Sequence, residues 1–235
     1  MKKYLELFKN GFDSTVEEKT KVENWPYVGY SPDEDVVVYT VIPEKPGDPM
    51  VDLGLSVKWA TMNVGASNTE EYGDYFAWGE TEPKEVYGTS TYKWYSSSGN
   101  LTKYNTASHY GIVDNKTQLE LSDDAAHVNL GGDWRMPTDA EWAELREQCT
   151  WMWTTQNGVN GYTVTGPNGK SIFLPAAGYR SGNSLREVGE VDRYWSSSLA
   201  IPYTTYALGS SVKSGLSGFY RSEGVPVRPV RPYNK

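Results

Sequence analysis

The part of this chain after residue 150 carries so many turn residues that it can form strands and loops but no long helix. Asn157-Gly158, Asn160-Gly161 and Asn168-Gly169 are three Asn-Gly pairs, and this dipeptide is the strongest local signal for a tight hairpin turn. Alternating apolar and polar residues lie around these pairs. From residue 151 to the C-terminus we therefore predict only strands and loops.

The segment from residue 194 to residue 235 has a composition that suits a recognition surface. Between residues 201 and 220 only Lys213 is charged, and Ser, Gly, Thr and Tyr fill most other positions. Tyr gives a large contact area at low entropic cost, while Ser and Gly adapt around it. The segment contains no His or Cys, and its single acid is Glu223. Composition alone fits an ordinary sheet edge with turns equally well.

The clearest helix signal lies at residues 138–149. Thr138 is the predicted N-cap and Glu141 follows three residues later, which forms a capping box. Trp142, Leu145 and Cys149 then fall on one face of the helix. This placement explains Cys149 as a core residue.

A second, shorter helix is predicted over residues 122–128. Ser122 is its expected N-cap, and Asp123 and Asp124 lie in its first turn, where the helix dipole favours acids. His127 follows these acids by three and four residues, a spacing that can bring a carboxylate and an imidazole together. Helix capping explains these acids better than a metal site, which needs more ligands.

The N-terminal part reads as a separate module. Residues 1–24 favour a short helix, and residues 27–30 and 36–41 favour a β-hairpin with its turn at 31–35. Several prolines and a glycine then indicate a linker, so we predict an N-terminal module over residues 1–47 and a main domain over residues 48–235. The residues that mark this linker are Pro43, Pro46, Gly47 and Pro49.

The main domain begins with an alternating apolar pattern that predicts a half-buried strand. A polar stretch over residues 87–115 follows, and its aromatic content predicts an ordered loop rather than disorder. Strands, two helices and further strands make an α+β fold with mostly antiparallel pairing. The residues of the alternating pattern are Leu53, Leu55, Val57 and Trp59.

Overall composition excludes several classes of protein. The net charge of −8 argues against binding to nucleic acid, which needs a basic surface. Cys149 is the single cysteine, so no internal disulfide forms, and a disulfide-free setting is expected. We find no secretory signal and no membrane span, and we expect a virion-associated or cytoplasmic protein that does not insert into membranes.

Six segments together resemble one family along residues 51–231: VDLGLSVKWATMNVGA, YGDYFAWGET, DDAA, GGDWRMPTDAEWAEL, CTWMWTTQNGVNGYTVTGPNGKSIFLPAAGYR and YWSSS…RSEGVPVRPV. They are similar to the Fibrobacter succinogenes major paralogous domain family. That family is similar to the C-type-lectin-like fold, in the group that includes formylglycine-generating enzymes. The hairpin near residue 30 resembles leaders on phage or phage-like surface proteins of gut bacteria.

The same fold resembles the variable proteins of diversity-generating retroelements, in which error-prone copying at template adenines rewrites a C-terminal stretch. An Asn codon AAC altered at its adenines can encode Tyr, Ser, Gly, Thr, Ala, Ile, Phe, Leu or Pro, the residues that fill this stretch. By resemblance, Tyr206 and Leu208 match the constant framework, with Ala207, Gly209 and Ser211 pointing the other way. The resemblance implies ligand-binding positions at Ile201, Tyr203, Thr204, Ala207, Gly209, Ser211, Leu216, Gly218, Phe219, Tyr220, Ser222 and Glu223.

We therefore expect a non-catalytic protein that binds a protein or glycan receptor on a cell surface, without cofactor or metal. Tyr203, Phe219 and Tyr220 are the expected anchors, because aromatic residues dominate interface energetics. Catalysis by the formylglycine-generating route needs paired cysteines, and Cys149 stands alone. The short EPN, QPD and WND motifs of calcium-dependent lectins are absent.

The alternatives to this expectation belong to other classes. One is a glycan-binding or adhesin domain of fixed specificity on a bacterial surface, a second is an enzyme of the formylglycine-generating group, and a third is a structural virion component. The oligomeric state stays open, because related binders occur as monomers and as trimers.

Overall fold

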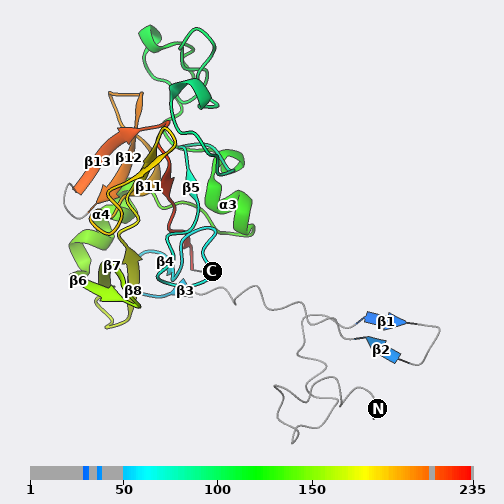
Figure 1. The fold of residues 1–235 in the computed structure, drawn as a ribbon, viewed down its shortest axis with the longest axis vertical. Coiled ribbons are helices and arrows are strands. Elements are labelled where there is room, and N and C mark those ends of the chain that lie inside the picture. Colours follow the sequence, from blue (N-terminus) through cyan, green and yellow to red (C-terminus); the bar gives the residue numbers. More distant parts are fainter. Residues whose placement is uncertain (1–28, 32–35, 39–49, 212–214, 234–235) are drawn as a thin grey trace, which may run out of the picture. The chain divides into compact units, whose positions relative to one another are not determined.

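The computed structural model describes residues 29–31, 36–38, 50–211 and 215–233 (Figure 1). The chain divides into two units, residues 1–47 and residues 48–235. In the first unit β1 (Gly29–Ser31) and β2 (Val36–Val38) pair in antiparallel fashion, within the hairpin that the sequence predicts. The predicted helix over residues 1–24 and most of the predicted turn lie outside the described residues.

The second unit is a mixed α+β structure with few helices, and its strands pair in antiparallel fashion, which confirms the general fold class. Short 3₁₀-helices interrupt its loops. Its described elements are β3 (Met50–Val51), β4 (Lys58–Ala60), β5 (Tyr75–Phe76), η1 (Thr89–Thr91), η2 (Ser108–Tyr110), η3 (Leu121–Asp123), α3 (Ala125–Leu130), α4 (Asp139–Gln148), β6 (Thr150–Gln156), β7 (Val159–Thr165), β8 (Ser171–Pro175), β9 (Tyr179–Ser181), β10 (Ser184–Arg186), β11 (Tyr194–Leu199), β12 (Tyr206–Ser211), β13 (Gly215–Tyr220), β14 (Val225–Pro226) and β15 (Val230–Arg231).

The strands of this unit form small sheets. Three of these sheets have three strands each, in the orders β3-β4-β15, β6-β7-β8 and β11-β12-β13, while β5 pairs with β14 and β9 with β10. Because β15 pairs with β4, which in turn pairs with β3, the two ends of the unit lie side by side (Figure 1).

Helix α4 begins as the sequence predicts. The Glu141 backbone N–H donates to Thr138 Oγ1 at 3.2 Å, and the Thr138 N–H donates to Glu141 Oε2 at 2.8 Å. These two bonds complete the capping box and satisfy donors that a helix start leaves free. Trp142 and Leu145 are buried, and Cys149, at the C-cap, packs half-buried against their cluster.

The short helix differs from its prediction in where it begins. The cap is Asp124 rather than Ser122, and Asp124 Oδ1 accepts the backbone N–H groups of Ala126 and His127. Asp124 also accepts the Met136 N–H, at 2.8 Å from its Oδ2. This acid is therefore the helix cap and also a bridge to the chain before α4, because only a carboxylate at this buried position can accept so many donors.

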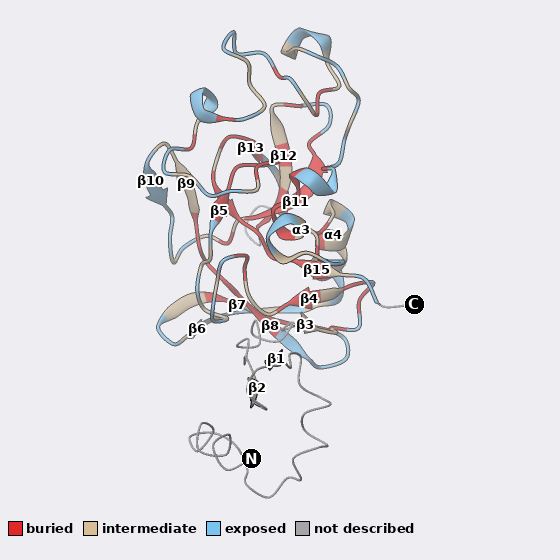
Figure 2. Cartoon of the chain, turned by 90° about the vertical axis from the view of Figure 1, so that its right-hand side faces the viewer, coloured by how far each residue is buried: buried red, intermediate tan, exposed pale blue. Residues whose placement is uncertain are grey.

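Two aromatic clusters form most of the core, which Figure 2 shows as the red interior of the unit. Trp78, Trp142 and Trp195 are fully buried, and each indole N–H donates to a backbone carbonyl. The acceptors of the first two are the carbonyls of Ser196 and Trp195 in β11. Buried indoles usually have such partners, and these bonds fix β11 between the two clusters.

The predicted alternation over residues 53–59 is confirmed in burial, but the strand is shorter. Its apolar residues are buried while Gly54 and Ser56 are exposed, and only residues 58–60 pair as β4. Asn157-Gly158 forms the tight turn between β6 and β7, as predicted. Asn160-Gly161, in contrast, lies inside β7, where a Cβ on Gly161 would come within 2.3 Å of the Leu174 carbonyl oxygen.

The stretch over residues 87–115 is an ordered loop, as its aromatic content predicts. Tyr92, Leu101 and Tyr104 are buried. The Tyr92 hydroxyl donates to the Trp78 carbonyl, and the Tyr104 hydroxyl to Asp123 Oδ2. These side chains hold the loop to the core. Its described regular elements are two short 3₁₀ turns.

Candidate functional site

Strands β12 and β13 present two faces with opposite properties. Ala207 and Gly209 lie on the buried face, together with Phe219 of the neighbouring strand. Tyr206, Leu208, Gly218 and Tyr220 lie on the other face, where they are half-buried or exposed. Side chains in a strand alternate between faces, so Tyr206 and Leu208 point outward while Ala207 and Gly209 point inward.

This orientation reverses the one expected from the resemblance. Ala207, Gly209 and Ser211 were expected on the ligand-binding side, but all three are buried. A Cβ on Gly209 would lie 2.6 Å from the Phe219 ring, and the Ser211 hydroxyl donates to Asp192 Oδ1 at 3.2 Å. Small residues are required here because large rings of the core occupy the space above them.

Other expected contact residues are also buried. Phe219 is 8% exposed, and the Arg193 guanidinium carbon lies 4.8 Å from the centre of its ring. The buried Thr204 hydroxyl donates to Asn105 Oδ1 at 3.0 Å. Ser222 is buried as well. These residues support the surface from beneath, and they do not offer side chains to a ligand.

Glu223 is partly buried beside Arg193, with 3.7 Å between the Glu223 Oε2 and Arg193 Nη1 atoms. Burial raises the pKa of Glu223, and the arginine opposes this only in part. Leu216 lies in β13 opposite Ser210 of β12, and its side chain is outside the described part of the structure.

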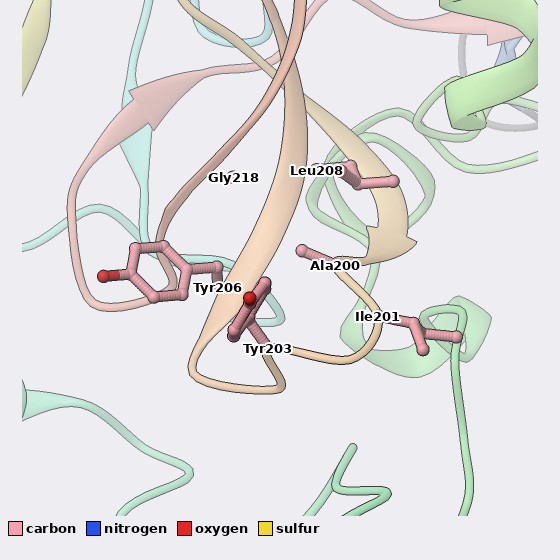
Figure 3. A pocket seen from close by; sticks show the side chains of 6 residues that line it. All are labelled: Ala200, Ile201, Tyr203, Tyr206, Leu208 and Gly218. Carbon is pink, nitrogen blue, oxygen red and sulfur yellow. The ribbon is translucent and has the colours of Figure 1, made fainter.

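The remaining expected residues come together at the surface. Ile201, Tyr203 and Tyr220 are 62%, 65% and 53% exposed. Ile201, Tyr203 and Gly218 line a hollow of about 460 Å³, and Tyr220 stacks on Tyr206, which also lines it. Figure 3 shows side chains of its lining, which comes from β12, β13 and the loop before β12. The hollow is lined by Ala200, Ile201, Tyr203, Tyr206, Leu208 and Gly218.

We call Ile201, Tyr203, Tyr206, Leu208, Gly218 and Tyr220 the aromatic face. None of these residues carries a charge at neutral pH. The rings of Tyr206 and Tyr220, opposite each other in β12 and β13, stack with centroids 4.6 Å apart. A hydrogen bond between their hydroxyls raises the pKa of Tyr206, so the phenol stays neutral. The aromatic face is therefore an uncharged surface of rings and aliphatic groups around a hollow.

A buried arginine holds the loops around this face. Arg221 follows β13 and is 1% exposed. Its guanidinium donates to the backbone carbonyls of Lys103, Tyr104 and Thr204, and its Nε donates to the Tyr92 hydroxyl, at 3.0 to 3.1 Å. The acceptors in these bonds are neutral, so Arg221 acts as a hub that fixes loop positions.

Helix α4 lies against the sheet that carries the aromatic face. It packs against β11, β12 and β13. Along β12 the burial decreases from Ser210, which is 2% exposed, to the half-buried Leu208 and Tyr206. The aromatic face thus lies at the more exposed end of β12.

Sequence reasoning assigned Tyr206 and Leu208 to the constant framework, so it missed them as part of the surface. A signal was present in the chain: over residues 206–209 small residues alternate with large ones, and Trp195 and Phe219 need small neighbours. The face with the small residues must then be the inner one.

Cys149 and His127 lie in structural surroundings. Burial raises the pKa of the Cys149 thiol to about 11, so it stays protonated and unreactive at neutral pH. His127 Nδ1 lies 3.1 Å from the Trp134 carbonyl oxygen, while Asp124 caps the helix. Within the described ranges, no three His, Cys, Asp or Glu residues gather closely enough to hold a metal ion. No described helix is long and apolar enough to cross a membrane.

Comparisons with protein-family models, with curated proteins and with solved structures each find no match for this chain.

Proposed function

We propose that this chain is a non-catalytic binding protein and that the aromatic face is its ligand-binding surface. The observation that carries the proposal is the exposure of Ile201 and Tyr203 at an uncharged hollow, with the exposed Tyr220 stacked on Tyr206 of its lining. Exposed apolar groups gathered in one place favour an interaction site, whereas single ones are ordinary on protein surfaces. The unreactive Cys149 thiol is consistent with binding rather than catalysis.

The chemistry of the face indicates how it binds. Tyr203 and Tyr220 supply large rings that lose little entropy when they are fixed in a complex. The loop that carries Tyr203 is fastened by Arg221 and Thr204, so the surface is ordered before a ligand arrives. Affinity then rests on shape and desolvation, and it changes little with salt because the face carries no charge.

More specifically, we propose that residues 48–235 form a C-type-lectin-like domain of the paralogous family named above. The chain would then be the variable protein of a diversity-generating retroelement. The resemblance of residues 51–231 supports it, as does the composition of the segment that holds the aromatic face. Ile201, Tyr203, Gly218 and Tyr220 are both exposed and within the stretch that copying would rewrite. Ligand specificity would then reside in these positions.

A cell-binding assay tests the aromatic face directly. The labelled full chain is applied to a panel of gut bacteria, and the Tyr203→Ala/Tyr220→Ala variant is compared with a Leu121→Ala/Leu185→Ala control. Leu121 and Leu185 are also exposed apolar residues, 53% and 42%, but lie outside the face. We expect at least about a tenfold loss of binding for the face variant and none for the control.

Equal binding by both variants would refute the proposal. Periodate or protease treatment of the cells identifies the receptor as glycan or protein. Loss after periodate alone would favour the glycan-binding alternative, in which the rings of Tyr203 and Tyr220 stack on sugars.

A further inference from the structure

Strand β6 is an edge strand with an open side. It is the outer strand of the sheet β6-β7-β8 and pairs only with β7 among the described strands. The pairing runs regularly from Thr150 opposite Thr165 to Gln156 opposite Val159, without a bulge. Figures 1 and 2 both place β6 at the rim of the unit. Seven residues of strand are thus available along one edge.

The geometry of the hairpin identifies which peptide groups face outward. Asn157 and Gly158 form a two-residue turn, so Gln156 and Val159 make the first hydrogen-bonded pair. In an antiparallel ladder such pairs alternate along the strand. The peptide groups of Trp151, Trp153 and Thr155 therefore point away from β7. In the described part of the chain no other backbone accepts from or donates to them.

Natural edge strands normally carry features that prevent pairing, and β6 has none of them. Lysine, proline, a bulge or a very short strand usually protects an edge. The sequence of β6 is TWMWTTQ, which contains no charge, no proline and no glycine. Met152 and Trp153 are 59% and 44% exposed. The strand is long, regular and uncharged, which favours an edge that pairs with another strand.

We propose that this edge joins two copies of the chain into a dimer, by antiparallel pairing of β6 with β6 about a two-fold axis at Trp153. In this register Trp153 lies opposite Trp153 of the second copy, and Trp151 lies opposite Thr155. All three outward-facing residues then form hydrogen-bonded pairs reciprocally, as a two-fold interface requires. The proposal is independent of the aromatic face, which belongs to another sheet.

Side-chain positions support the same register. The Trp151 and Trp153 rings both contact Tyr162 of β7, with centroids 5.7 and 4.8 Å away, so they lie on one side of the sheet. The two Trp153 rings of a dimer are therefore neighbours across the axis, where aromatic pairs stabilise a sheet.

Charge favours a second copy over a charged peptide as the occupant. The whole chain has a net charge of −8, and two copies repel each other over most approaches. Strand β6 is free of charge, so its self-pairing places no like charges opposite one another. A basic or acidic peptide, in contrast, finds no counter-charge on this strand.

Sedimentation of the full chain over a concentration series tests the proposal. We expect a species of twice the 26.3 kDa chain mass at the higher concentrations. Trp153→Lys and Trp153→Glu each place like charges across the axis, and we expect each to weaken association by at least about tenfold. An equal mixture of the two variants should restore the dimer, because opposite charges then meet.

Met152→Lys is the matched control, since residue 152 points to the other side of the strand and faces the uncharged Thr154. We expect it to remain dimeric. Thr155→Pro is a second test variant, which removes an outward N–H without touching the ladder to β7 and should give monomers. Circular dichroism checks that each variant is folded.

Three results would overturn the proposal. One is a natural chain that stays monomeric at every concentration, and another is a dimer that persists in both Trp153 variants. The third is a Lys and Glu mixture that remains monomeric, because this would place the axis elsewhere.

Discussion

Gly209 and Gly218 lie in neighbouring strands on opposite faces of one sheet, so adding a methyl group to each distinguishes the inner face from the outer. A Cβ on Gly209 would lie 2.6 Å from the Phe219 ring and 2.7 Å from the Tyr194 carbonyl oxygen. A Cβ on Gly218 would lie 3.1 Å from the Tyr206 Cβ, next to the hollow. The first substitution therefore has to displace core atoms, while the second needs only a small shift.

Overpacking of a core costs about 1 to 3 kcal/mol, so we expect Gly209→Ala to lower the free energy of unfolding by that amount. In a domain of this size that corresponds to a melting temperature about 2 to 12 °C lower. Gly218→Ala reduces the backbone freedom of the unfolded chain, which stabilises the folded protein by about 0.4 to 1 kcal/mol. This gain offsets the cost of the close contact. Its net effect should therefore be near zero.

Urea unfolding, followed by tryptophan fluorescence, measures both variants against the natural chain. The order of stability is decisive, because the two substitutions are chemically identical. If Gly218→Ala were the more damaging variant, or if both lost the same free energy, the assignment of inner and outer faces would be wrong.

Three further outcomes are expected. Arg221→Leu should lower the free energy of unfolding, measured in urea, by about 3 to 5 kcal/mol, because the carbonyls that bind the guanidinium lose their hydrogen bonds. Arg186→Leu, at an exposed position, should change this free energy little. Burial raises the pKa of Glu223 above 4.5, so its stabilising contribution is present below pH 4.5 and lost as the pH rises through the folded-state pKa. Glu223→Gln should consequently be more stable than the natural chain at pH 7, with a smaller difference at pH 4, and equal differences at both would contradict this. The Cys149 thiol should resist a thiol reagent at neutral pH until urea unfolds the chain, because its pKa is about 11.

Local signals were enough to predict part of this fold. The capping box at Thr138 and Glu141 involves residues three apart, so no distant contact is needed to recognise it. The Asn157-Gly158 turn is local in the same sense. Asn160-Gly161 has the same sequence signal but lies in a strand, because the backbone of β8 approaches Gly161 closely. That approach is a tertiary contact, and no dipeptide reveals it.

The outward-facing residues of β12 were expected on the wrong side of the strand. Alternation in β12 separates its residues correctly into two sets, yet alternation does not say which set is buried. The answer depends on Trp195 and Phe219, which meet over Gly209 with their rings 5.9 Å apart. Placing the larger residues Tyr206 and Leu208 in the core is wrong, because the rings of Trp195 and Phe219 already fill that space.

Deep sequencing of the coding locus across a population tests the central claim most directly, because it reads the binding face residue by residue. The account predicts a near-copy of the codons for residues 195–230 beside a reverse-transcriptase gene, differing only at adenines. It also predicts that substitutions concentrate at exposed positions such as Ile201, Tyr203, Gly218 and Tyr220 and spare Gly209 and Phe219. An invariant segment without a template copy would contradict the retroelement proposal. Substitutions concentrated at the buried positions would contradict the aromatic face itself.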